Sequence, residues 1–137
     1  MTIVGFNFTK IHAEKTNPIK GKINISNKVA LTGVEKSDIS LGKDDQQGVK
    51  FLFNYTSTYE PKIGPVELDG DLLFLSSAKE VKEIVDGWTK DKKIPQAVMS
   101  SVINAVLTKC NLQALISSRD INLPPSIQLP KVKIKQQ

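Results

Sequence analysis

Residues 49–75 read VKFLFNYTSTYEPKIGPVELDGDLLFL and carry the strongest structural signal in the chain. Apolar and aromatic side chains alternate with polar ones on both sides of the stretch EPKIGP at residues 60–65. A period of two predicts strands that each bury one face, and the prolines and glycine predict a turn between them. We therefore predict a β-hairpin over residues 49–75 whose buried face includes Val49, Phe51, Phe53 and Tyr55. Sheets can also use such aromatic rows to stack nucleic-acid bases, but a row this dense favours the core.

Two earlier segments follow the same period. On one side of residues 22–34 lie mainly apolar residues and a glycine: Ile23, Ile25, Val29, Leu31 and Gly33. Near the N-terminus, Val4, Phe6 and Phe8 predict a first strand toward Ala13 that ends before Thr16-Asn17-Pro18. The first half of the chain therefore predicts four strands.

The second half changes to a helical period. Ser77 and Glu80 match a capping box, in which a serine hydroxyl and a glutamate carboxylate bind the first backbone N–H groups of a helix. Apolar residues then follow at helical spacing: Val81, Ile84, Val85 and Trp88. After a linker at residues 91–94, Pro95 suits the first turn of a second helix. We expect that helix to reach Ser118, a length of about 35 Å at 1.5 Å per residue.

These elements predict an α+β fold, with a four-stranded antiparallel sheet followed by a short and a long helix packed on one face. A length of 137 residues is typical of one domain. We expect a single domain over residues 1–137, with strands in residues 1–75 and helices in residues 77–118. Residues 119–137 are expected to form an extended, proline-containing basic tail.

Few residues suggest catalysis. His12 is the single histidine, with Glu14 on the same strand face, and a general base needs a partner that orients it. Cys110, the single cysteine, lies among apolar helix residues, which is typical of a core thiol. The sequence contains no phosphate-binding or nucleophile motif and no Cys/His cluster for zinc. We expect a non-catalytic protein without a cofactor or metal site.

The strand that follows the turn carries three alternating acids, Glu67, Asp69 and Asp71. Carboxylates of this kind can hold Mg²⁺ or Ca²⁺. Alternate side chains on one strand lie ~7 Å apart, too far for all three to chelate one ion easily. The pattern favours a solvated outer face, paired with lysines on a neighbouring strand.

The net charge of +5 is unevenly distributed along the chain. Residues 1–34 carry +4, residues 35–91 carry −5 and residues 92–137 carry +6. Basic ends of this kind either bind a polyanion or provide solubility. The candidate RNA-binding residues are the lysines of these ends: Lys10, Lys15, Lys20, Lys22, Lys28, Lys92, Lys93, Lys131, Lys133 and Lys135. Lysines contact phosphates and give little base specificity, so such binding would be sensitive to salt.

The order of elements resembles that of the SecB-like export chaperones. The opening Phe6-Asn7-Phe8-Thr9-Lys10-Ile11 is similar to the Phe-x-x-x-x-Ile strand of that family, and residues 121–127 (INLPPSI) are similar to its ending after the long helix. The resemblance covers most of the chain as a pattern. It implies an oligomeric holdase with an apolar groove for unfolded chains. The well-known members are acidic, whereas this chain has a pI near 9.3, which would suit the same scaffold used on ribosomal RNA.

Two functions therefore remain open. The first is association with ribosomal RNA, ribosomal proteins or another structured RNA through the basic ends. The alternative is a SecB-like holdase that binds unfolded polypeptide, with a homo-oligomer expected if the protein is free in solution. The longest apolar runs are about four residues, far short of the ~20 that span a bilayer, and the N-terminus lacks the pattern of a secretory signal. With one unpaired cysteine, these features predict a cytoplasmic protein without a membrane partner.

Overall fold

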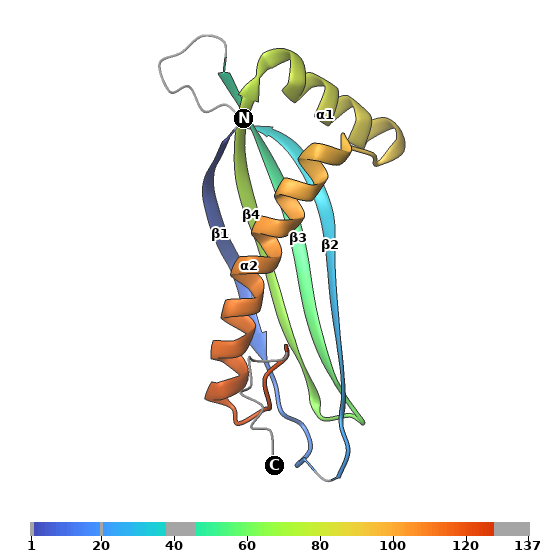
Figure 1. Cartoon of the computed structure of the whole chain (residues 1–137), viewed down its shortest axis with the longest axis vertical. Coiled ribbons are helices and arrows are strands. Elements are labelled where there is room, and N and C mark those ends of the chain that lie inside the picture. Colours follow the sequence, from blue (N-terminus) through green and yellow to red (C-terminus); the bar gives the residue numbers. More distant parts are fainter. Residues whose placement is uncertain (1, 20, 38–45, 128–137) are drawn as a thin grey trace, which may run out of the picture.

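The computed structural model describes residues 2–19, 21–37 and 46–127. Four strands come first: β1 (Thr2–Ala13), β2 (Asn24–Ser37), β3 (Gln46–Glu60) and β4 (Gly64–Ser77). Two helices follow, α1 (Ala78–Asp91) and α2 (Gln96–Asp120). The strands form one antiparallel sheet in the order β1-β4-β3-β2, and both helices lie on one face of it (Figure 1). The α+β architecture expected from the sequence is confirmed.

The β3–β4 hairpin occupies the centre of the sheet. Odd residues of β3 and even residues of β4 face the helices, as in the pairs Phe51–Leu72 and Tyr55–Leu68. The predicted core residues of β3 are at most 1% exposed. The hairpin is therefore confirmed, and the aromatic row lies in the hydrophobic core.

Strand β1 joins the core through two phenylalanines that lie across Gly70. Phe6 stacks on Phe53 with ring centroids 5.1 Å apart, and Phe8 meets Phe53 edge-on at 6.2 Å. A Cβ atom at Gly70 would collide with the backbone oxygen of Asn7 and lie 2.7 Å from the Phe53 ring. Gly70 thus allows three aromatic rings to meet over one strand.

The expected alternation of β2 is interrupted. Leu31 pairs with Phe53 and Gly33 pairs with the adjacent Leu52, so Thr32 is an extra residue without a partner on β3. This β-bulge moves Gly33 to the outer face and gives Val34, opposite Phe51, its place on the core side. A Cβ atom at residue 33 would lie only 2.8 Å from Leu52. The assignment of Gly33 to the core side was therefore wrong.

Helix α1 begins at the predicted place, with the Ser77 half of the capping box formed and the Glu80 carboxylate bonded to a side chain instead of a backbone N–H. The Ser77 hydroxyl accepts a hydrogen bond from the Glu80 N–H at 3.2 Å, and the Glu80 carboxylate accepts one from Ser76. Val81 and Ile84 are buried, and Val85 packs against the core. Trp88, the last of the apolar residues at helical spacing, is only half-buried and lies outside the core cluster.

Helix α2 crosses the sheet diagonally and runs two residues beyond the predicted end at Ser118 (Figure 1). Its 25 residues correspond to about 38 Å, and Pro95 is the N-cap, one position before the helix. Every fourth residue from Val98 to Ala114 is buried against the sheet. The extended segment therefore begins at Ile121, and Arg119 and Asp120 belong to the helix. Within the described chain, no helix is long and apolar enough to cross a membrane.

Candidate functional site

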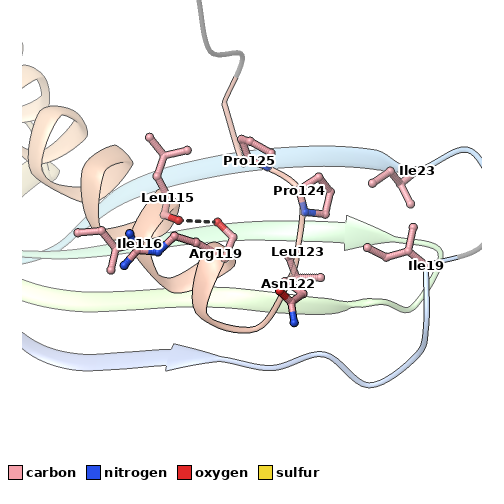
Figure 2. A pocket seen from close by; sticks show the side chains of 10 residues that line it. Ile19, Ile23, Leu115, Ile116, Arg119, Asn122, Leu123, Pro124 and Pro125 are labelled. Atoms are coloured by element: carbon pink, nitrogen blue, oxygen red, sulfur yellow. Dashed lines mark hydrogen bonds between the residues drawn. The ribbon is translucent and has the colours of Figure 1, made fainter.

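An apolar groove with a volume of about 750 Å³ lies at the C-terminal end of α2 (Figure 2). Two stretches far apart in sequence form its walls: the β1–β2 connection, and the last turns of α2 with the segment that follows the helix. The lining residues are Ile19, Ile23, Leu115, Ile116, Ser118, Arg119, Asn122, Leu123, Pro124 and Pro125. Seven of these ten are aliphatic or proline. The walls of the groove are therefore mainly apolar.

The wall that contains Ile19 and Ile23 is positioned by the β3–β4 turn. Thr16 donates its backbone N–H to the Ile63 carbonyl at 2.7 Å, and the Asn17 side chain donates to the Lys62 carbonyl at 2.5 Å. Gly64 permits this approach, because a Cβ atom there would collide with the backbone of Glu14. The β1–β2 connection is thus tied to the sheet beside the groove.

The opposite wall follows from the way α2 ends. Asn122 has a left-handed backbone (φ 59°), and the chain there reverses in a Schellman motif. The N–H groups of Leu123 and Asn122 bond to the carbonyls of Ser118 and Arg119, at 2.8 and 3.1 Å. We call residues 121–127 the strap, because this reversal carries them back over the sheet.

Hydrogen bonds from the sheet hold the strap. The Tyr59 hydroxyl donates to the Pro124 carbonyl at 2.7 Å, and the Asn27 side chain donates to the Ser126 carbonyl at 2.8 Å. Burial raises the pKa of the Tyr59 hydroxyl above its ordinary value, so it remains a donor through neutral pH. Leu123, within the strap, is itself buried. The strap is therefore a fixed wall of the groove.

The groove is suited to burying the apolar side chains of a ligand. Pro124 and Pro125 have no backbone N–H, so this part of the strap cannot pair with an extended ligand as a neighbouring strand would. The Ser118 hydroxyl already donates to helix carbonyls. What the groove offers a ligand is mainly aliphatic surface, with Arg119 and Asn122 as polar groups.

The proposed RNA-binding lysines lie on several elements of the fold. Lys10 is on the outer face of β1, 3.6 Å from Glu67, and Lys28 lies beside a polar hollow on the same outer face. Lys15 and Lys22 lie within the β1–β2 connection, whereas Lys92 and Lys93 follow α1 at the other end of the sheet (Figure 1). The remaining four, Lys20, Lys131, Lys133 and Lys135, lie outside the described residues. The structure does not gather the described lysines on one surface.

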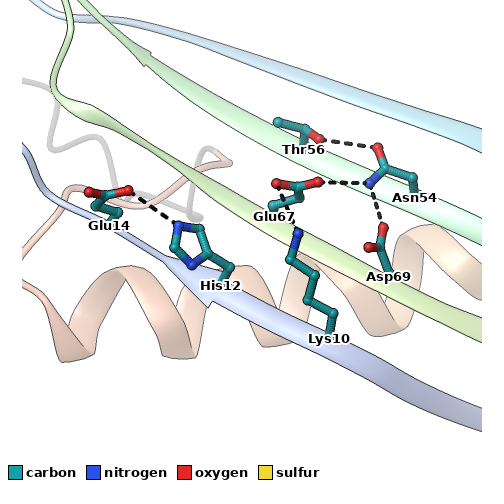
Figure 3. Close-up of polar contacts among 7 residues, drawn as sticks. All are labelled: Lys10, His12, Glu14, Asn54, Thr56, Glu67 and Asp69. Carbon is teal, nitrogen blue, oxygen red and sulfur yellow. Dashed lines mark hydrogen bonds and ion pairs between the residues drawn. The ribbon is translucent and has the colours of Figure 1, made fainter.

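The acidic row of β4 lies on the outer face of the sheet (Figure 3). Glu67 pairs with Lys10, and the Asn54 side chain donates to Asp69 at 2.5 Å. The described residues contain no group of acids, histidine or cysteine arranged to hold a metal ion. The expected pairing with a lysine of the neighbouring strand is confirmed for Glu67.

Neither candidate catalytic residue lies in the groove. His12 and Glu14 are 3.3 Å apart, and both are about half exposed (Figure 3). Cys110 is fully buried, and burial raises the pKa of its thiol to about 12. A neutral thiol of this kind is a poor nucleophile at physiological pH.

The sequence did not identify the groove. Its available signal was Asn122 followed by Leu-Pro-Pro, because asparagine tolerates a left-handed helix end and prolines prevent the helix from continuing. The contribution of Ile19 and Ile23 depends on the β1–β2 connection folding against the β3–β4 turn, about 45 residues further along the chain. A contact between segments this far apart in the chain leaves no local pattern in the sequence.

Comparison with known proteins establishes the fold of this chain and nothing finer. No family model matches the chain, and no curated protein matches it in sequence. Among solved structures, it is similar to the SecB-like chaperone Rv1957 of Mycobacterium tuberculosis, which was solved in complex with a ChAD peptide from the HigA1 antitoxin Rv1956. The match covers 95% of this chain and 89% of that chain, with a TM-score of 0.59 and 9% sequence identity. The chain therefore has a SecB-like fold.

Proposed function

We propose that this protein binds unfolded polypeptide segments in the apolar groove and acts as a non-catalytic holdase. The observation that carries the proposal is the groove of about 750 Å³, walled by isoleucine, leucine and proline side chains, in a SecB-like fold. Its volume is within the 300–1,000 Å³ of typical ligand sites. The structural neighbour was solved with a bound peptide, which supports a polypeptide ligand.

The energetics of such a site suit unfolded chains. Each client leucine, isoleucine or phenylalanine that becomes fully buried contributes roughly 1.5–3 kcal/mol. Side-chain burial does not require a particular backbone hydrogen-bond pattern, so many different sequences can bind. Native proteins keep these side chains inside, so the groove distinguishes unfolded clients from folded ones.

The RNA hypothesis rests on charge alone. The described candidate lysines lie on separate elements, and the fold comparison concerns a chaperone bound to a peptide. RNA association through the basic ends therefore remains a prediction, as do the cytoplasmic location and the homo-oligomer.

The test is suppression of aggregation of an unfolded client at near-stoichiometric ratios, with and without RNase. Replacing Ile116 in the groove with glutamine should weaken suppression several-fold while the melting temperature stays nearly constant, because Ile116 is already 38% exposed. Ile3→Gln is a matched control, since Ile3 is 37% exposed at the other end of β1. If the wild-type protein leaves aggregation unaffected but sediments with ribosomes, the holdase proposal is wrong and the RNA hypothesis gains support.

A further inference from the structure

Arg119 is the one ionisable side chain that lines the groove in the described part of the chain. Its side chain is 77% exposed, and Figure 2 shows it beside Ile116, on the opposite side of the groove from Ile19 and Ile23. The wall of Ile19 and Ile23 is therefore wholly aliphatic, and the opposite wall adds a cation to its apolar side chains. A client in the groove meets this cation on one side.

Two negative features near Arg119 could cancel its effect on a client. The first is Asp120, whose carboxylate is 3.6 Å from the Arg119 guanidinium. Both side chains are largely exposed, so this pair is weak and screened by water. A guanidinium carries five N–H donors, so Arg119 can bind a second carboxylate while it remains near Asp120.

The second feature is the C-terminal end of α2, where carbonyl groups concentrate partial negative charge. Here the carbonyls of Ser118 and Arg119 accept hydrogen bonds from Leu123 and Asn122, as the Schellman motif requires. These bonds reduce the negative potential that an approaching acid would meet. Asn122 also lines the groove, and its side-chain amide adds a neutral donor to the same wall.

We infer that Arg119 is a specificity-determining residue, and that the groove prefers apolar segments flanked by acidic residues over the same segments flanked by basic ones. This inference rests on the proposed function, and it adds the class of client. The guanidinium pairs with a client aspartate or glutamate, and it repels a lysine at the same position. The net charge of +5 favours the same clients at longer range.

The test uses two labelled peptides with the same central Leu/Ile/Phe segment, one flanked by aspartates and the other by lysines. Exposed ion pairs change affinity modestly, so we expect the wild-type protein to prefer the acidic peptide by about three-fold to ten-fold in 0.1 M salt. That ratio should fall toward one in 1 M salt, where the screening length is ~3 Å. The Arg119→Gln variant should lose most of the preference in low salt.

Lys109→Gln is the matched control, because Lys109 is an exposed cation on α2 that does not line the groove and its loss changes the net charge equally. This variant should keep nearly the wild-type ratio. Equal binding of both peptides to the wild-type protein would overturn the inference and leave the holdase proposal intact. An equal loss for both peptides in Arg119→Gln would also overturn it, because Arg119 would then act through its apolar stem. If neither peptide binds, the proposed function itself fails.

Discussion

The β3–β4 hairpin forms the centre of the sheet and the strap packs on the face that the helices cover, and different forces hold these two regions in place. The hairpin contributes rows of fully buried aromatic and aliphatic side chains, among them Phe51, Phe53 and Leu72. The strap contributes one buried leucine and two carbonyls that accept hydrogen bonds from Tyr59 and Asn27. Removing hairpin packing should therefore unfold the whole protein, whereas weakening the strap should alter the groove with a smaller loss of stability.

The largest effect is expected at Phe53, which contacts Phe6 and Phe8 across Gly70. The Phe53→Ala variant should lose about 3–5 kcal/mol of unfolding free energy, the usual cost of truncating a core aromatic residue. Chemical denaturation measures this loss. Leu52→Ala, next to it on the outer face and only half-buried, should cost clearly less. A loss below 1 kcal/mol at Phe53 would mean that the aromatic row is not the core.

An intermediate effect is expected at Cys110, where α2 packs on the hairpin. Its thiol pKa is raised from 9.0 to about 12, so the folded state retains the proton that the unfolded state releases above pH 9. The resulting stabilisation is complete below pH 9 and is lost as the pH rises toward 12, at most about 1.4 kcal/mol per pH unit. Denaturation curves at pH 8 and pH 10 should show the stability advantage of wild type over Cys110→Ala shrinking by about 1 kcal/mol. A constant difference would indicate that the thiol is accessible to water.

A smaller effect is expected at Tyr59. The Tyr59→Phe variant removes the hydroxyl that bonds to the Pro124 carbonyl and should cost about 0.5–1.5 kcal/mol. Its specific consequence is local, because the Leu123 amide should exchange with solvent faster when the strap opens. Tyr55→Phe is the matched control: Tyr55 is also buried, but its hydroxyl bonds to Asn111 of α2 at 3.1 Å. Equal exchange at Leu123 in both variants would show that Tyr59 does not hold the strap.

The hairpin and the strap also differ in how far their structures could be predicted from sequence. The hairpin is specified locally, because the period of two places Val49, Phe51, Phe53 and Tyr55 on one face whatever the rest of the chain does. The cap of α1 at Ser77 is local for the same reason. The bulge near Thr32 was not predictable, since the pairing of Leu31 and Val34 with neighbouring core positions depends on the register with β3. In the sequence, the bulge is visible only as a shift by one residue in the alternation of apolar and polar side chains.

The groove is the least local feature of the molecule. Its walls combine Ile19 and Ile23 with residues from 115 to 125, and it exists because α2 crosses the sheet and then reverses at Asn122. From the sequence we recognised an apolar, proline-containing segment after α2, but we assigned all of it to a tail. The lysines of the ends were assigned from charge alone, and charge does not determine which of them share a surface.

The most direct test of the holdase proposal is a hydrogen-exchange footprint of the full chain with and without an unfolded, apolar peptide. We predict that slowed exchange is concentrated in residues 19–23 and 115–123, at the walls of the groove, and that the outer face of the sheet around Asn54 and Glu67 is unchanged. Protection should weaken in the Ile116→Gln variant and persist in Ile3→Gln. A footprint on the outer face, or at the lysines near Lys92, would contradict binding in the groove.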